Sequence, residues 1–229
     1  DGSDIPGATS NPYEVSVTSA GDNNAVFSVV VSNGAGKVSS STATLLVFTT
    51  RYSEVPKADG TPYDRTDCVK DNISGLVWEG KNPSGSTSRA ADSGFITNYD
   101  STDILQKPPS GASPRSKPTQ AEIDAPTNTI GYVNSVNASS LCGYMDWRLP
   151  TKAELFSIVD TNQASAPYID SVWFPNTPAT YPIYWTSTPL EPEVGFNPDY
   201  AYTIDFYTPK PFGMTRVGVT GLEKVRLVR

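Results

Sequence analysis

The sequence of 229 residues contains no histidine. Histidine is the commonest general base of enzymes and the commonest metal ligand, so its absence excludes Ser-His-Asp and Cys-His catalytic arrangements and weakens the case for zinc chemistry. Carboxylates are numerous enough to supply a glycosidase pair, with Glu191 and Asp199 as examples, but no motif fixes the distance between any two of them. We therefore expect a protein that is not an enzyme.

The chain is also short of positive charge and of long hydrophobic runs. Its 17 Lys and Arg residues face 24 Asp and Glu residues, which gives a net charge of -7 and an isoelectric point near 4.6. A nucleic-acid surface needs a basic stripe that neutralises phosphates, so no nucleic-acid partner is expected. No window approaches about 18 continuous apolar residues, and no signal-peptide pattern opens the sequence, so we expect a soluble protein without membrane insertion.

Cysteine is scarce as well, with only Cys68 and Cys142. They lie far apart in the sequence, so neither belongs to a CxxC metal or redox motif. Proline and glycine, by contrast, are abundant at 20 and 17 residues, while the hydrophobic fraction is a modest 37%. This composition favours short strands joined by turns over long helices, in a chain long enough for one large domain or two smaller ones.

Residues 1–48 have the alternation of β-strands. Apolar side chains alternate over residues 13–17, 27–31 and 38–47, and Asn33–Gly36 supplies turn residues that tolerate positive φ. The segment resembles the second half of a bacterial immunoglobulin-like domain, in a pattern carried by Ile5–Thr9, Asp22–Phe27, Val31–Asn33 and Leu45–Val47. In that resemblance Phe27 takes the place of the tyrosine-corner aromatic and Val29 that of the second cysteine.

An immunoglobulin-like sandwich needs about 100 residues, so residues 1–48 predict an incomplete all-β module. Half a sandwich leaves an apolar face and unpaired strand edges in water. Two explanations stay open: the first strands stand upstream of this sequence, or another chain completes the sheet. The second explanation predicts a homo-oligomer or filament formed through residues 1–48.

The rest of the chain divides into a linker and a larger domain. Residues 49–63 contain Pro56, Gly60 and Pro62 in a polar context and read as a linker. Residues 64–229 form the second domain, with a long surface insertion at 81–126. Two helices are expected, at 127–140 and at 151–160, and the second opens with a capping box between Thr151 and Glu154.

Four motifs of the second domain identify it as similar to the Lcl C-terminal domain family of bacterial surface proteins. They are Gly75–Lys81, Cys142–Leu155, Tyr184–Thr188 and Val225–Arg229. The resemblance implies an α+β, C-type-lectin-like fold with two helices and short twisted antiparallel sheets. It further implies strands at 185–188 and 200–206, a disulfide between Cys68 and Cys142, and a location outside the cytosol, extracellular or at the cell surface.

The signature residues of these motifs are expected to support the fold rather than to bind. They are Trp78, Trp147, Arg148, Trp185 and Arg226. Large aromatic side chains can supply much of a core that has few long aliphatic strands, and a guanidinium beside an indole can stack on it. Asp146 is expected to pair with Arg148 or Arg226.

Four residues are candidates for binding. Trp173 could form a platform for a sugar ring, and Glu191, Glu193 and Asp199 lie in or beside an acidic loop that superficially resembles the calcium and sugar motif of C-type lectins. Calcium needs six to eight oxygen ligands, and the matching asparagines are missing, so we expect no cofactor and keep calcium as the alternative. The resulting hypothesis is an adhesin or display module that binds glycans or surface proteins non-covalently; the alternative is a structural subunit of an extracellular fibre or pilus.

Overall fold

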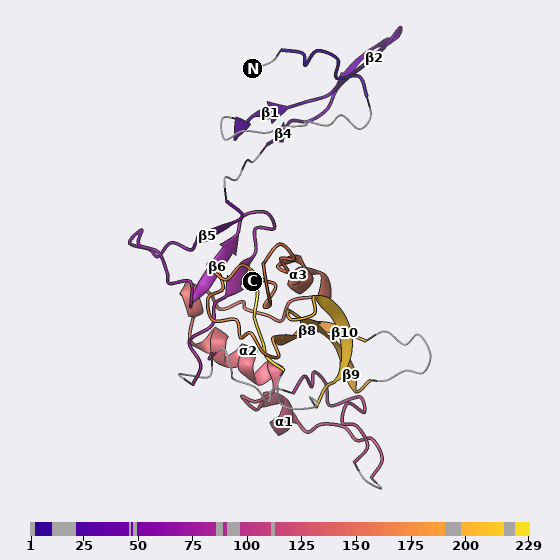
Figure 1. The fold of residues 1–229 in the computed structure, drawn as a ribbon. Coiled ribbons are helices and arrows are strands. Elements are labelled where there is room, and N and C mark those ends of the chain that lie inside the picture. The colour runs from indigo at the N-terminus through magenta and orange to yellow at the C-terminus, as the bar shows by residue number, and fades with distance from the viewer. Residues whose placement is uncertain are drawn as a thin grey trace. The chain divides into compact units, whose positions relative to one another are not determined.

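The computed structural model describes residues 3–10, 22–45, 47, 50–85, 89–90, 97–110, 113–190, 198–217 and 223–229. The chain forms two compact units, Asp1–Arg51 and Tyr52–Arg229 (Figure 1). The second unit combines helices with small antiparallel sheets, so the prediction of a mixed helix and sheet protein is confirmed.

Two short antiparallel pairs make up the described part of the first unit. Strand β1 (Val26–Phe27) pairs with β4 (Ala43–Thr44), and β2 (Val30–Asn33) forms a hairpin with β3 (Gly36–Ser39). The side chain of Asn33 closes the predicted turn, because its Oδ1 accepts hydrogen bonds from the backbone N–H groups of Ala35 and Gly36. The strand expected at 13–17 lies outside the described residues.

The second unit begins earlier than residue 64, because much of the expected linker is part of its fold. Strand β5 (Tyr52–Glu54) is an edge strand of a three-stranded antiparallel sheet with β6 (Cys68–Asp71) and β7 (Val77–Glu79). Tyr52 and Val55 are buried in its core. The proline and glycine residues between Pro56 and Pro62 therefore form a turn within the domain rather than a connection between domains.

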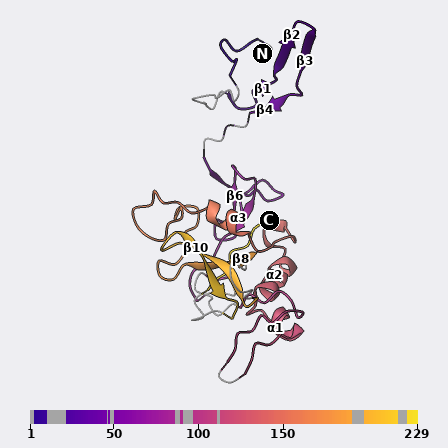
Figure 2. The ribbon, with the colours of Figure 1, turned by 90° about the vertical axis from the view of Figure 1, so that its right-hand side faces the viewer.

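A second three-stranded sheet has the order β10-β9-β8. It contains β8 (Ile183–Pro189), β9 (Tyr200–Asp205) and β10 (Lys210–Thr215), all antiparallel. The first two strands were expected from the sequence and the third was not. Figure 2 shows this sheet beside the helices.

The described residues contain three α-helices, where two were expected from the sequence. They are α1 (Gln120–Asp124), α2 (Thr129–Ala138) and α3 (Lys152–Ser157), with a 3-10 turn at Leu141–Gly143. The capping box of α3 is formed as predicted, since Thr151 and Glu154 each accept the other's backbone N–H. Helix α1 carries the same device, built from Thr119 and Glu122 inside the segment that was expected to be an insertion.

Helix α2 packs against the core through Tyr132, Val133 and Val136. Tyr132 and Val136 are buried, whereas Ile130 and Val133 are only half-buried. Gly131 permits a close approach of the helix to the segment that enters it, because a Cβ at that position would lie 2.1 Å from the carbonyl oxygen of Ala125.

The motifs far apart in the sequence meet at the C-terminal segment. The backbones of Val77 and Arg229 exchange two hydrogen bonds at 3.0 Å, and those of Arg148 and Val228 exchange two at 2.9 Å. Val228 thus lies between β7 and the segment that precedes α3. Three of the four sequence motifs are therefore one structural unit at the centre of the domain.

Candidate functional site

Four of the five signature residues lie inside the domain, whereas Arg148 is exposed. Trp78, Trp147, Trp185 and Arg226 are all at most 2% exposed, and Trp147 donates its indole N–H to the carbonyl oxygen of Leu141 at 3.1 Å. Arg226 donates to the carbonyl oxygen of Glu79 and to the hydroxyl of Thr177. A ligand has no access to these groups in this arrangement, so they support the fold.

The ion pairs around Asp146 differ from those expected. Asp146 pairs with Arg229, at 2.8 Å from its Nε, and not with Arg148 or Arg226. Arg148 instead grips Glu154 through both terminal nitrogens, at 2.9 and 2.7 Å. The guanidinium of Arg229 also lies 3.7 Å from the centre of the Tyr144 ring. The predicted pairing of Asp146 with Arg148 or Arg226 is therefore wrong, because the C-terminal segment brings Arg229, 83 residues away in the sequence, to Asp146.

A buried ionic cluster surrounds Glu79. One carboxylate oxygen contacts the Lys81 ammonium at 2.9 Å and accepts the hydroxyl of Tyr132, while the other accepts the backbone N–H of Leu227 at 2.9 Å. Arg89 lies 3.5 Å from the first oxygen. Glu79, Lys81 and Tyr132 are at most 3% exposed. The cluster therefore places one carboxylate among several cations in the interior.

The pKa values in the cluster follow from burial and charge. Burial is the largest influence on Lys81 and lowers the pKa of its ammonium to about 8, against the opposing attraction of Glu79. Burial likewise disfavours the Glu79 carboxylate, but Lys81 and Arg89 outweigh it and hold its pKa below the ordinary value. Burial and the adjacent Glu79 raise the pKa of Tyr132 well above its usual range. Since these groups are enclosed, the cluster organises the core.

The Arg148–Glu154 pair makes stability depend on acid pH. Hydrogen bonds from Arg148, and then the Thr151 backbone, lower the pKa of Glu154 to about 2. The unfolded carboxyl titrates near its ordinary value, so the pair stabilises the fold above that value and loses its effect as the pH falls toward about 2. We expect Glu154→Gln to be less stable than wild type at neutral pH but to lose less stability on acidification. Urea denaturation at several pH values tests this. An equal loss of unfolding free energy on acidification in the two proteins would contradict it.

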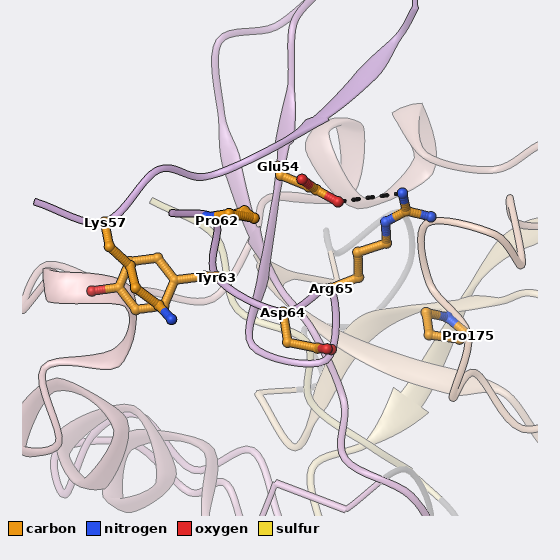
Figure 3. A pocket seen from close by; sticks show the side chains of 7 residues that line it. All are labelled: Glu54, Lys57, Pro62, Tyr63, Asp64, Arg65 and Pro175. Atoms are coloured by element: carbon orange, nitrogen blue, oxygen red, sulfur yellow. Dashed lines mark hydrogen bonds and ion pairs between the residues drawn. The ribbon is translucent and has the colours of Figure 1, made fainter. Parts of the chain in front are cut away.

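A surface hollow of about 480 Å³ lies beside strand β5 and is called here the β5 hollow (Figure 3). Its lining residues are Glu54, Lys57, Pro62, Tyr63, Asp64, Arg65 and Pro175. The volume lies within the range of roughly 300–1,000 Å³ that is typical of ligand sites. The hollow thus combines an aromatic ring with two carboxylates and two cations.

Local contacts hold the polar groups of the β5 hollow in place. Asp64 accepts the backbone N–H of Thr66 at 2.7 Å, and this contact with Thr66 lowers the pKa of its carboxyl. Arg65 points toward Glu54, at 3.4 Å, while the Lys57 ammonium lies 5.4 Å from the centre of the Tyr63 ring (Figure 3). Asp64 is therefore a fixed anionic acceptor, and Lys57 is a long exposed side chain that a ligand can displace.

Of the predicted binding residues, Trp173 lies beside the β5 hollow. The Arg65 guanidinium is 4.0 Å from the centre of the Trp173 ring and donates to the carbonyl oxygen of Val172 at 3.2 Å. Arg65 therefore covers one face of the indole, and Tyr52 packs at 6.2 Å between ring centres. In this arrangement Trp173 positions Arg65 rather than offering that face to a sugar.

The other predicted binding residues do not join the hollow. Asp199 is 1% exposed, and its carboxylate lies 3.2 Å from Nε of Arg115. Glu191 and Glu193 lie outside the described residues. Within the part of the chain that the structure describes, no three acidic or cysteine side chains gather as a metal site would require. The β5 hollow was not predicted from the sequence, because Glu54, Lys57, Pro62 and Tyr63 fell in the expected linker, although Tyr63-Asp64-Arg65 shortly before Cys68 was a usable signal.

The implied disulfide is present: Cys68 and Cys142 are bonded, with their Cα atoms 6.6 Å apart. Among the described residues, no helix has the length and apolar character needed to span a bilayer. The comparison with curated proteins and the comparison with solved structures each found no match. The family model for the Lcl C-terminal domain, however, matches residues 67–229 and confirms the resemblance. Since this match covers more than half of the sequence, the chain belongs to the Lcl C-terminal domain family, which indicates a bacterial surface-associated protein.

Proposed function

We propose that the Tyr52–Arg229 unit is a non-enzymatic, surface-displayed module that binds glycans through the β5 hollow. The observation that carries the proposal is the composition of that hollow: one tyrosine ring beside the carboxylates of Glu54 and Asp64. Sugars present C–H faces to aromatic rings and pairs of hydroxyls to carboxylates. An extracellular location and the C-type-lectin-like fold implied by the family resemblance belong to the same proposal.

The electrostatics of the hollow favour binding over catalysis. A general acid or base works best with a pKa near the operating pH. The pKa of Asp64 is instead lowered from its ordinary value, because the contact with Thr66 stabilises the ionised form. Lys81 has a pKa of about 8, which is closer to the operating pH, but its ammonium is enclosed in the core. We accordingly propose that the module catalyses no reaction and needs no cofactor.

A glycan array with the full chain tests the proposal. Asp64→Asn keeps the acceptor for the Thr66 N–H but removes the charge, and it is expected to weaken binding to the selected glycans roughly 10–100-fold, as for loss of a charge-assisted hydrogen bond. Lys57→Ala is expected to have a smaller effect. The matched control, Asp146→Asn, alters an exposed carboxylate whose partner is Arg229 and should bind like wild type.

Two outcomes would contradict the glycan proposal. One is the absence of any hit on an array that includes bacterial and host sugars. The other is binding that Asp64→Asn leaves unchanged. Addition of a calcium chelator is expected to have no effect, since the β5 hollow supplies only two carboxylates whereas calcium takes six to eight oxygen ligands.

A second candidate function is assembly into a fibre through the first unit. The specific observation in its favour is a row of exposed valines on and beside the β2–β3 hairpin, where Val31 is 67% exposed and its cross-strand partner Val38 is 74% exposed. Val29 and Val30 are also more than half exposed. Apolar patches of this kind mark surfaces that another element or chain covers, and completion of residues 1–48 by another chain is one of the two explanations that their immunoglobulin-like resemblance leaves open.

Sedimentation velocity distinguishes the fibre subunit from a monomeric binding module. If the first unit assembles, wild type is expected to sediment as oligomers whose size grows with concentration, and the double variant Val31→Lys, Val38→Lys as a monomer. Both positions are exposed, so the substitutions carry little folding cost. A wild-type protein that stays monomeric at high concentration would contradict the assembly proposal while leaving the glycan proposal intact.

A further inference from the structure

The β5 hollow holds a cation of its own. The Lys57 ammonium lies 5.4 Å from the centre of the Tyr63 ring, and Figure 3 shows the lysine side chain lying across that ring. Among the described residues, no carboxylate forms an ion pair with this ammonium. A cation over an aromatic face is attracted by the negative potential of the ring. The ring of Tyr63 is therefore a cation-binding face that the protein covers with its own side chain.

The two carboxylates of the hollow are unequally paired. Glu54 lies 3.4 Å from the Arg65 guanidinium. Asp64 accepts the backbone N–H of Thr66 at 2.7 Å, and within the part of the chain that the structure describes it forms no ion pair. The Asp64 carboxylate is exposed, and its contact with Thr66 lowers its pKa, so it stays ionised. The hollow thus contains a fixed negative charge without a cation at ion-pair distance.

Displacement of Lys57 would leave the hollow with a net negative charge. Arg65 and Glu54 neutralise each other, so Asp64 then carries the uncompensated charge. Arg65 is also held over the Trp173 ring, with its guanidinium 4.0 Å from the ring centre. A ligand that displaces Lys57 therefore meets an aromatic face and an unpaired carboxylate. A cationic group satisfies both of them.

Neutral and acidic sugars fit the hollow less well than a protonated amino sugar does. A neutral sugar that stacks on Tyr63 displaces the Lys57 ammonium and replaces the attraction of a full charge with uncharged contacts. An acidic sugar meets the carboxylates of Glu54 and Asp64 and needs Lys57 as its counter-charge. A protonated amino sugar replaces one ammonium with another, and its hydroxyls can still donate to the carboxylate oxygens.

We propose that the β5 hollow selects glycans that carry free, protonated amino groups, and that Lys57 is a built-in competitor for the same place. This inference rests on the proposed glycan binding and names its ligand class. The ammonium of the sugar takes the place of the Lys57 ammonium on Tyr63, with the Asp64 carboxylate as its counter-charge. The volume of about 480 Å³ exceeds what one ammonium needs, so it leaves room for the sugar ring. The net charge of -7 adds a general attraction for such a polycation.

Isothermal titration calorimetry of the full chain tests the selection with two probes that differ only in acetylation. They are the β-1,4-linked tetramers of glucosamine and of N-acetylglucosamine, in mildly acidic buffer that keeps the amino groups protonated. The glucosamine tetramer is expected to bind at least about tenfold more tightly, because acetylation removes the charge but keeps the sugar rings. Equal binding of the two probes, or tighter binding of the acetylated one, would overturn the proposal.

Lys57→Ala tests the competition. Removal of the resident ammonium is expected to raise the affinity for the glucosamine tetramer about 2–5-fold, as for loss of an exposed cation–π contact. A ligand that used Lys57 as its counter-charge would bind this variant more weakly. Weaker binding of the glucosamine tetramer to Lys57→Ala would therefore overturn the proposal.

Asp64→Asn and Asp146→Asn form a matched pair for the anion. Both remove one negative charge, but only Asp64 lines the hollow, whereas Asp146 pairs with Arg229 elsewhere. Asp64→Asn is expected to lose most of the tenfold or greater preference for the amino probe, and Asp146→Asn is expected to keep it. Loss of the preference in both variants would show a general attraction to an acidic protein, which would overturn the site.

Two results separate this inference from the glycan proposal on which it rests. Array glycans that bind without an amino group and are weakened by Asp64→Asn would overturn the inference and leave the glycan proposal standing. The absence of any glycan hit would overturn both. N-acetyl-lysinamide is the last probe: if it binds as tightly as the glucosamine tetramer, the hollow recognises a lysine side chain of a protein and the amino-sugar assignment is wrong.

Discussion

Replacing both Cys68 and Cys142 with alanine is expected to lower the unfolding free energy of the Tyr52–Arg229 unit by about 4 kcal/mol. The bond closes a loop with a sequence separation of 74, and on the chain-entropy model a loop of that length greatly restricts the unfolded chain. Both residues are buried in the core cluster that also contains Trp147 and Trp185. The disulfide thus joins β6 to the 3-10 turn at Leu141–Gly143.

Urea denaturation of the oxidised and reduced wild type separates the covalent effect from lost packing. Reduction breaks the bond without removing an atom from the core, so most of the loss is expected on reduction alone. The double alanine variant serves as the control, since a reductant should leave its stability unchanged. A reduced wild type as stable as the oxidised protein would show that the bond contributes nothing to the fold.

Glu79→Gln is expected to destabilise the same unit by about 3–5 kcal/mol, because it removes the anion of a buried ionic cluster while its cations stay enclosed. The carboxylate contacts Lys81, Tyr132 and the backbone of Leu227, and it is 0% exposed. Glutamine preserves the size of the side chain but offers only one oxygen. The ammonium of Lys81 would then lose its ion pair in a site that water does not reach.

The control for Glu79→Gln is Asp146→Asn, which neutralises a carboxylate at the surface. Asp146 pairs with Arg229 in a solvated setting, where ion pairs contribute little to stability. Both variants remove one negative charge, so the comparison isolates burial from net charge. A shift of the denaturation midpoint of similar size in the two variants would contradict a special role for the buried cluster.

Short sequence motifs predicted the capping box and the turn that depend only on neighbouring residues. The capping box of Thr151 and Glu154 lies at the start of α3, and the Asn33–Gly36 turn closes the β2–β3 hairpin. The same reasoning could have found α1, since Thr119 and Glu122 form an identical box. Such features depend on residues within one turn of chain, so they can be identified before the fold is known.

The candidate sites could not be located in this way. Glu54, Lys57 and Tyr63 fell within the expected linker, and the pairing of β5 with β6 makes that segment part of the domain. Trp173 was chosen for its aromatic ring, but Arg65 lies over one face of that ring. Contacts between side chains that are distant in the sequence depend on tertiary packing, and sequence spacing carries no information about them.

The sequence by itself determined the family, the mixed α and β composition and the helix and turn boundaries that short motifs encode. It also excluded histidine-based chemistry, because that exclusion needs no coordinates. Only the tertiary structure decided that Arg229 rather than Arg226 meets Asp146, that Glu79 is enclosed with Lys81, and that α2 leaves Ile130 half-buried. These outcomes depend on contacts between segments as far apart in the sequence as Val77 and Arg229, whose geometry is set by close packing of the whole core.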